Sequence, residues 1–427
     1  MNLNITLNKT YAYIIAFLLL LDGSSMWQLT GVIPLSVNSI RLILFFVCLL
    51  AIVSIGRINI SYRFVGIVII TLIWFLFFGI ISHYHVPYYI RNLVLVYLVF
   101  FLYVYTMMKS GKLKDLAYAY MTIFFIIAGF TTFMWLFASI IRIIPLSSTT
   151  YTWSEHTLST STFHNLYFEN SAQNTSIFGK TIARNTGIYA EAPGFSSYFL
   201  YAFGIEMSFF KQYKGHKVRM MFLLLTSLTT LSTKLILFLV IILVVDYLLS
   251  FQKKRSVFFV IFRWVLSITV LVIGGYIFYS VLIDKMSTGS FTIRLDDVRA
   301  SLKVWKGSPI FGSGLGNTTP IINNFTVARN NNGLSMGLLL ILAQGGIWLT
   351  SFYIIPFIIT IFREEDKVMK KNIFILALAV LINLFVSNVI LAPSFLMFLA
   401  IGYAYLSMTQ TEHSELLQKF LRSQNES

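Results

Sequence analysis

Arg184 and Glu191 lie seven positions apart, just before an apolar run that begins near Pro193. An arginine offers a planar head with several N–H donors, which suits phosphate oxygens. A carboxylate nearby could take a proton from a hydroxyl group as a general base. Alternatively, the two residues pair with each other, and an exposed pair contributes little to stability. The residue types leave both interpretations open.

Lys234 is a second candidate phosphate ligand, because it interrupts an otherwise apolar stretch, 219–250, at Leu231-Ser232-Thr233-Lys234. A stretch of this length barely suffices for two membrane spans, so it predicts a helical hairpin whose tip holds Lys234 near the outer face. A cation there is costly unless it reaches water, an anion or a phosphate. The alternative is that Lys234 binds no ligand and that its side chain only extends to the water at the membrane surface.

A third group of candidates follows in the stretch from Arg294 to Asn317. Helical spacing puts four apolar residues on one face and three basic residues on another, which predicts an amphipathic helix at the membrane interface, anchored by its tryptophan. The apolar residues are Leu295, Val298, Leu302 and Trp305, and the basic ones are Arg299, Lys303 and Lys306.

The neighbours Asp296 and Asp297 would point in different directions on this helix, so they do not form a catalytic pair. We expect one of them to cap a helix that begins near Leu295.

Three glycines come after this helix, at Gly312, Gly314 and Gly316, and Asn317 follows them. Glycine permits positive backbone torsions and close approach to a ligand, although a plain glycine turn would look the same. No strand–turn–helix context surrounds them, which argues against a nucleotide-binding loop.

These candidates must be positioned by a membrane protein. Hydrophobic residues make up 57% of the chain and charged residues only 11%, against about 25% charged in soluble domains. Apolar runs of suitable length predict an all-α, polytopic protein, with one membrane domain over 1–427 and about twelve transmembrane helices. The expected runs are 11–22, 38–56, 65–82, 92–108, 117–141, 194–210, 219–233, 235–250, 257–282, 334–362, 372–388 and 391–408.

The basic residues fix the expected orientation. More than half of the 32 Lys and Arg residues fall in alternate short connections or near the termini, which the positive-inside rule places in the cytoplasm. Both long polar stretches, about 142–192 and 283–333, then become large periplasmic loops. Their basic residues suggest an anionic ligand on the outer face, and this topology excludes nucleic acid as a partner.

The first polar stretch is rich in Ser, Thr and Asn with interleaved aromatic residues. It could be a solvated loop or a surface for a polar polymer such as a glycan, on which aromatic faces stack. The aromatic residues are Tyr151, Trp153, Phe163, Tyr167 and Phe168. No metal-binding motif occurs in either stretch, so we expect metal-independent chemistry without a cofactor.

Three segments together resemble the O-antigen polymerase (Wzy-type) family, which is related to the O-antigen ligases. They are Arg184-x-x-Gly187-x-x-x-Glu191-x-Pro193, Ser232-Thr233-Lys234, and Arg294 through Gly312-x-Gly314-x-Gly316-Asn317, with the pair Gly345-Gly346 in the following span. Relatives often have Ser-Arg where this chain has Thr233-Lys234.

The resemblance implies a metal-independent glycosyltransferase of the bacterial inner membrane, with both termini cytoplasmic and its active site facing the periplasm. It would polymerise a surface polysaccharide by moving the growing glycan from undecaprenyl diphosphate to the terminal sugar of a new lipid-linked repeat unit. The implied partners are these lipid-linked oligosaccharides, inner-membrane lipids and a chain-length regulator protein.

The resemblance also gives each candidate residue a role. Arg184 and Lys234 would hold the diphosphate, and Glu191 would activate the acceptor hydroxyl. A second phosphate or the incoming unit would be bound by Arg294 and Arg299, and Gly187, Gly314, Gly316 and Asn317 would line the substrate site.

Two rival functions remain open. Ligases of the superfamily carry a histidine before the span that follows the second loop, whereas Arg329-Asn330-Asn331-Asn332-Gly333 has none. A flippase or other transporter would need functional polar residues along its spans and short outer loops, which is the opposite of this pattern.

Overall fold

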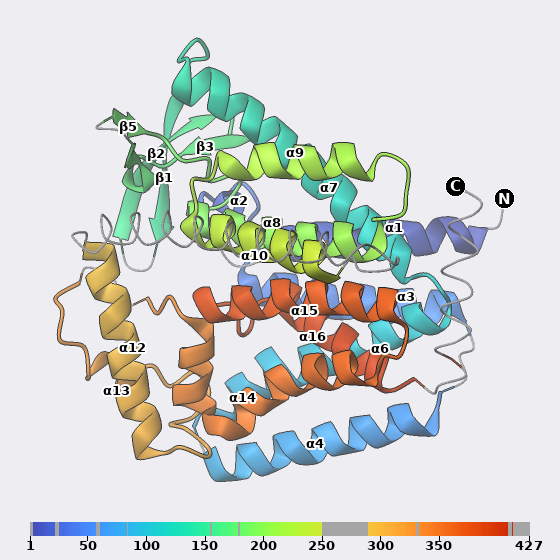
Figure 1. The fold of residues 1–427 in the computed structure, drawn as a ribbon. Coiled ribbons are helices and arrows are strands. Elements are labelled where there is room, and N and C mark those ends of the chain that lie inside the picture. The colour runs from blue at the N-terminus through green and yellow to red at the C-terminus, as the bar shows by residue number, and fades with distance from the viewer. Residues whose placement is uncertain are drawn as a thin grey trace, which may run out of the picture.

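The computed structural model describes residues 3–21, 25–56, 60–82, 84–153, 156–177, 180–249, 289–329, 333–408 and 412. Most of this part of the chain is helical (Figure 1). The helices before the first polar stretch are α1 (Leu3–Leu21), α2 (Met26–Leu29), α3 (Val37–Ile55), α4 (Tyr62–Ser82), α5 (Val86–Tyr89), α6 (Val96–Lys109) and α7 (Leu113–Met134), with π-helical turns η1 (Ile90–Leu95) and η2 (Trp135–Ile140). Those after it are α8 (Ala192–Phe209), α9 (His216–Leu228), α10 (Thr233–Leu249), α12 (Gly289–Gly307), α13 (Thr319–Ile322), α14 (Gly337–Arg363), α15 (Lys367–Val386) and α16 (Pro393–Leu406).

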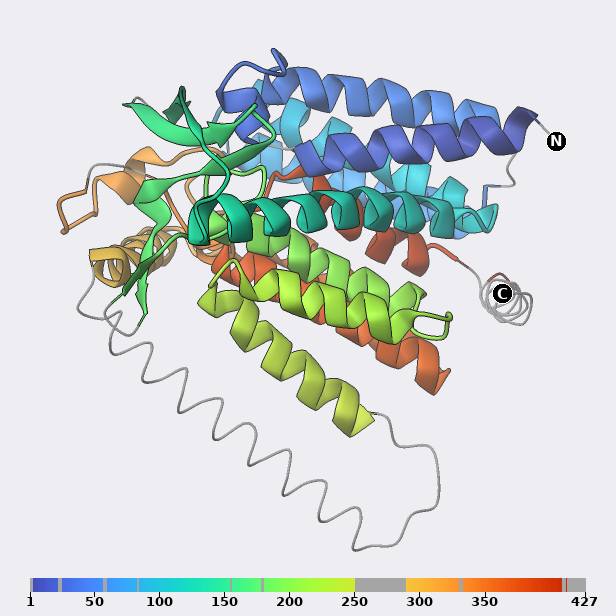
Figure 2. The same ribbon diagram turned by 90° about the horizontal axis from the view of Figure 1, so that it is seen from above.

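The long helices lie side by side and give the molecule two ends (Figures 1 and 2). We call the end that carries the β-strands and α12 the strand end. The beginning of α1 lies at the opposite end (Figures 1 and 2). The end of α16 lies beside the α3–α4 connection, because Ser61 Oγ donates to Ser407 O over 3.1 Å. The described parts of both long polar stretches lie at the strand end, away from the beginning of α1 (Figures 1 and 2).

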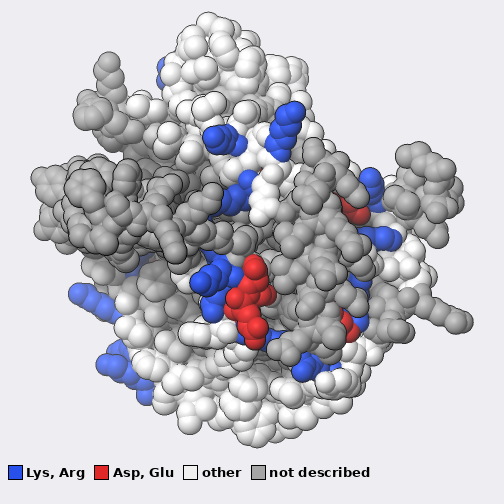
Figure 3. Space-filling model, turned by 45° about the vertical axis from the view of Figure 1, so that its right-hand side comes forward, with Lys and Arg blue, Asp and Glu red and all other residues white. Residues whose placement is uncertain are grey.

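Basic side chains are spread over the opposite end, around a smaller acidic group (Figure 3). Arg63 donates to Met408 O over 3.3 Å, and Arg363 donates to the carbonyl oxygens of Leu406 and Met408. Cations here satisfy carbonyl groups at the end of α16, where the helix dipole favours positive charge.

The predicted count of twelve spans is not supported. Within the described residues, six helices are long and apolar enough to cross a membrane: α3, α4, α5 to α6, α7 with η2, α14, and most of α15. Three apolar helices are shorter, namely Leu7–Leu21, Thr233–Ile242 and Pro393–Leu406. The 13 residues of α9 would span only about 20 Å, less than the ~30 Å of a hydrocarbon core. The expected span at 257–282 lies outside the described residues.

The first polar stretch contains strands, which were not predicted from the sequence. β1 (Ser147–Trp153), β2 (His156–Phe163) and β3 (Tyr167–Glu169) form an antiparallel sheet in that order. A second pair, β4 (Thr175–Ile177) and β5 (Lys180–Ile182), follows, with the short 3-10 turn η3 (Ser171–Gln173) before it. The sheet packs on α2 and on the end of α7.

The aromatic residues of this sheet largely face the protein. Tyr151, Tyr167 and Phe168 are buried, and the Tyr167 hydroxyl lies 2.7 Å from Ser139 Oγ on η2. Tyr151 packs beside Met26 of α2. Of the two alternatives for this stretch, a glycan surface built on these three rings does not fit, because they form the core that fixes the sheet to the helices.

The second polar stretch contains α12, as its apolar spacing predicts, but the helix begins at Gly289 and not near Leu295. Neither aspartate caps it. Asp296 and Asp297 are buried and both bind the guanidinium of Arg329, with N–O distances of 2.5 and 2.6 Å. Thr326 Oγ1 also donates to Asp296 and Ser335 Oγ to Asp297. The two carboxylates hold the chain after α13 against α12.

Helix α14 is broken at Gly346, whose φ of 60° and ψ of −164° are not helical. The segment after α12 fills the break. The N–H groups of Ile347 and Trp348 donate to Pro309 O and Ile310 O, both over 2.9 Å, and Gly314 N donates to Gln344 O over 2.8 Å. Backbone groups freed by the break thus find partners inside the protein, as they must in a membrane.

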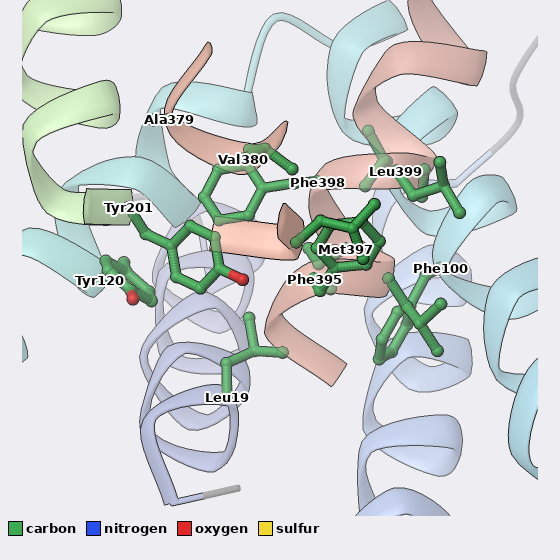
Figure 4. Packing of buried hydrophobic residues seen from close by; sticks show 14 of the residues in the cluster. Leu19, Phe100, Tyr120, Tyr201, Ala379, Val380, Phe395, Met397, Phe398 and Leu399 are labelled. Atoms are coloured by element: carbon green, nitrogen blue, oxygen red, sulfur yellow. The ribbon is translucent and has the colours of Figure 1, made fainter. Parts of the chain in front are cut away.

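Apolar and aromatic side chains from distant helices form the core. Tyr201 of α8 stacks on Phe398 of α16 with ring centroids 4.7 Å apart, beside Leu19 of α1 (Figure 4). This packing brings α8, whose first residue follows Glu191, against the C-terminal helices.

We predict that Gly346→Ala destabilises the protein by at least ~2 kcal/mol, because a Cβ at this strained torsion would lie 2.2 Å from Ile310 O. Thermal unfolding of the purified protein measures the change. Gly66→Ala in α4 is the matched control, since a Cβ there meets nothing within 4 Å. Equal unfolding temperatures for the two variants would contradict the backbone contact.

Candidate functional site

Residues 184–191 lead from β5 into α8 and contain a turn at Gly187, where Tyr189 N donates to Thr186 O over 3.0 Å. Asn185 fixes it to the α9–α10 turn: its N–H donates to Thr229 O over 3.0 Å, and its Nδ2 to Thr229 Oγ1 over 2.9 Å. At the other end, Tyr189 pairs with Ser25 in an isolated β-bridge. The segment is therefore held on both sides before α8 begins.

Arg184 lies beside Asn185 and is half-buried. Its Nε donates to Thr230 O over 2.9 Å, which is its only side-chain hydrogen bond within the described residues. Burial lowers the pKa of Arg184 to about 10, against the opposing charge of Glu191, so the guanidinium stays charged at neutral pH. Of the two alternatives that the sequence leaves open, the direct ion pair with Glu191 does not occur in this part of the chain.

Glu191 is the N-cap residue of α8, but its side chain makes no capping hydrogen bond. Among the described residues it has no side-chain hydrogen bond or ion pair. Burial raises its pKa above the usual value, while the charges of Arg184, Arg294 and Lys234 act in the opposite direction. One unpaired carboxylate thus lies within the electrostatic reach of three cations.

Lys234 does not reach outward as predicted. Its side chain is buried, and Nζ donates to Pro193 O over 2.8 Å, to Ser197 Oγ over 2.6 Å and to Ser387 Oγ over 2.6 Å. An ammonium group has three protons, and these three acceptors use them all. Lys234 therefore cannot bind a phosphate without losing a protein partner, and it acts on the site through its charge.

Arg294 joins this group from α12. Its side chain is exposed, and its charge acts on Arg184, Glu191 and Lys234. Arg299 is also exposed on α12, but five residues further on it points in another direction. No contact joins Arg299 to this group within the described residues.

The three glycines assigned to the substrate site pack closely against other parts of the chain. Gly187 is buried with φ +62°, and a Cβ would lie 2.8 Å from the Phe195 ring. At Gly314 and Gly316 a Cβ would lie 2.5 Å from Tyr84 and 2.9 Å from Tyr88. Their positive torsions are confirmed, and the approach they permit is to the chain itself.

Asn317 is half-buried, and its Nδ2 donates to Ser313 O over 3.0 Å. This hydrogen bond closes the turn between Ser313 and Asn317, so Asn317 helps to shape the glycine segment.

Three residues around Lys234 were not found from the sequence. Ser197 lies on α8, and Asn383 and Ser387 lie at the end of α15. Asn383 is buried, and its Oδ1 lies 3.4 Å from Lys234 Nζ. In the sequence, each of these three appears only as a polar residue near the end of an apolar run. Such residues are too common to identify a partner of Lys234.

No group of three or more His, Cys, Asp or Glu residues in the described part of the chain could hold a metal ion. Metal-independent chemistry stays a prediction. The sequence matches no protein-family model and no curated protein.

The arrangement can bind an anion between Arg184 and Arg294 at the strand end, with the carboxylate of Glu191 near it. Lys234 lies buried behind them and holds the beginning of α8 through Pro193 O and Ser197 Oγ. Such a site suits a phosphate ester whose departing oxygen gains negative charge, together with a hydroxyl that must lose a proton.

Proposed function

We propose that this protein is a membrane glycosyltransferase of the O-antigen polymerase type. It would transfer a growing glycan from undecaprenyl diphosphate to the terminal sugar of a new lipid-linked repeat unit, on the outer face of the bacterial inner membrane. The observation that carries the proposal is the group formed by Arg184, Arg294 and Glu191, whose members come from both long polar stretches. Apolar helices beside it suit a substrate carried in the bilayer.

In this reaction the acceptor hydroxyl oxygen attacks the anomeric carbon of the donor sugar. The bond from that carbon to the diphosphate oxygen breaks, and its electron pair leaves with the diphosphate. Arg184 and Arg294 stabilise the charge that grows there, and Glu191 takes the hydroxyl proton. Lys234 keeps the beginning of α8 in place through Pro193 O, so it positions Glu191 and does not touch the substrate.

We predict that Arg184→Ala abolishes long glycan chains while the protein still reaches the membrane, because one of the two diphosphate ligands is lost. Electrophoresis of the lipopolysaccharide measures chain length. Arg142→Ala is the matched control, since Arg142 is an exposed arginine of the same polar stretch.

Gene deletion separates the rival functions. Loss of a polymerase leaves lipid core capped by a single repeat unit, whereas loss of a ligase or flippase leaves bare core. Bare core alone, or normal chains in Arg184→Ala, would contradict the proposal.

Glu191 must be ionised to act as a base, and burial raises its pKa. We therefore predict that polymerisation activity falls on the acid side of its pH profile (the acid limb) at a pH above the usual pKa of a carboxylate. Activity should fall as the pH falls through this pKa. Arg294→Gln removes a charge that favours the carboxylate, so the limb should move to higher pH. Purified protein with lipid-linked repeat units provides the assay.

Arg142→Gln, with the same change of charge, should leave this limb in place. A limb at the same pH in Arg294→Gln and Arg142→Gln would show that Glu191 is not the group that titrates.

A further inference from the structure

Helix α12 lies across the strand end, roughly perpendicular to the long helices; Figure 1 shows it upright beside them, and Figure 2 shows it nearly end-on. Its protein-facing side is polar or small. Asp296, Asp297, Ala300 and Ser301 are buried, and α12 packs chiefly on α14. The apolar stripe predicted from the sequence is therefore not the side that packs on the protein.

That apolar stripe lies on the outward side. Leu295 is 41% exposed, and Val298, Leu302 and Trp305 are only half-buried. In a soluble protein such residues would face the core. A helix that keeps polar residues inside and an apolar stripe outside is suited to the boundary between lipid and water.

A basic stripe runs beside the apolar one. Arg299, Lys303 and Lys306 are exposed and recur at helical spacing. None of them has an ion pair in the described part of the chain, and Arg329 already neutralises both acidic residues of the helix. Arg294 belongs to the candidate site, because its charge acts on Glu191. Among the described residues, the stripe thus presents three cations that no acidic side chain neutralises.

We propose that the outward side of α12 binds anionic phospholipids, with Leu295, Leu302 and Trp305 among the acyl chains and with Arg299, Lys303 and Lys306 on the headgroup phosphates. A row of cations two turns long next to an apolar row fits a plane of headgroups better than a single diphosphate. The inference does not depend on the proposed glycosyl transfer, and it moves Arg299 from the substrate site to the lipid surface.

Fluorescence quenching in nanodiscs tests this proposal on the full chain. The signal of Trp305 is the difference between the protein and its Trp305→Phe variant. We expect brominated phosphatidylglycerol to quench it more than brominated phosphatidylcholine. In the Lys303→Gln/Lys306→Gln variant the preference should fall, by roughly five-fold for each lysine.

The matched control is Lys214→Gln/Lys217→Gln, which removes two exposed lysines, one from the α8–α9 connection and one from the first turn of α9. It should leave the quenching preference of Trp305 unchanged. Equal quenching by the two lipids, no quenching by either, or a preference that survives in Lys303→Gln/Lys306→Gln would overturn the proposal. The proposal would also be overturned if the fluorescence of Trp305 responded to inorganic diphosphate and showed no preference between the two lipids, because the basic stripe would then be a substrate site.

Discussion

The candidate site depends on one buried cation. Lys234 is 7% exposed, and a charge in that position must be satisfied by polar partners. The acceptors come from the beginning of α8 and the end of α15, so three helices meet at one ammonium group. One of these acceptors is Pro193 O, so the bond from Lys234 also fixes Glu191, which lies two residues before Pro193. The turn before α10 also provides the carbonyl that holds Arg184.

Close contacts of the backbone with itself provide the second constraint. The segment after α12 enters the break in α14. Only glycine fits at Gly312 and Gly346, where the backbones of these two segments touch. This contact, together with the pairing of Arg329 with Asp296 and Asp297, sets where α12 lies. The position of Arg294 near Glu191 follows from that placement. Arg184 and Arg294, which lie 110 positions apart in the sequence, thereby contribute to one site.

Local patterns in the sequence predicted the helices well, because apolar runs report directly on burial or lipid contact. They did not predict which runs form helices long enough to span a membrane: the run at 219–233 forms α9, which has only 13 residues. The sheet was missed because β1 and β2 are rich in Ser and Thr on both faces, so no apolar alternation marks the inner one. Tyr151 and Phe168 looked exposed for the same reason.

The roles implied by the family resemblance assign Arg184, Arg294 and Glu191 to one substrate, but the partners of Lys234 could not be predicted from the sequence. Hydrogen bonds to Ser197 and Ser387 depend on the packing of α8 against α15, which no spacing in the sequence encodes. Asp296 and Asp297 show the same limit, because their partner Arg329 lies more than thirty residues away.

A double-mutant cycle on undecaprenyl diphosphate binding tests the central claim, that Arg184 and Arg294 hold the same anion. Binding to the purified protein would be measured for Arg184→Gln, Arg294→Gln and the double variant. Each single change should weaken binding by roughly ten-fold or more, and the double change should cost less than the two together, with a coupling of about 0.5–3 kcal/mol. Losses that simply add, or unchanged binding in either single variant, would contradict a shared site.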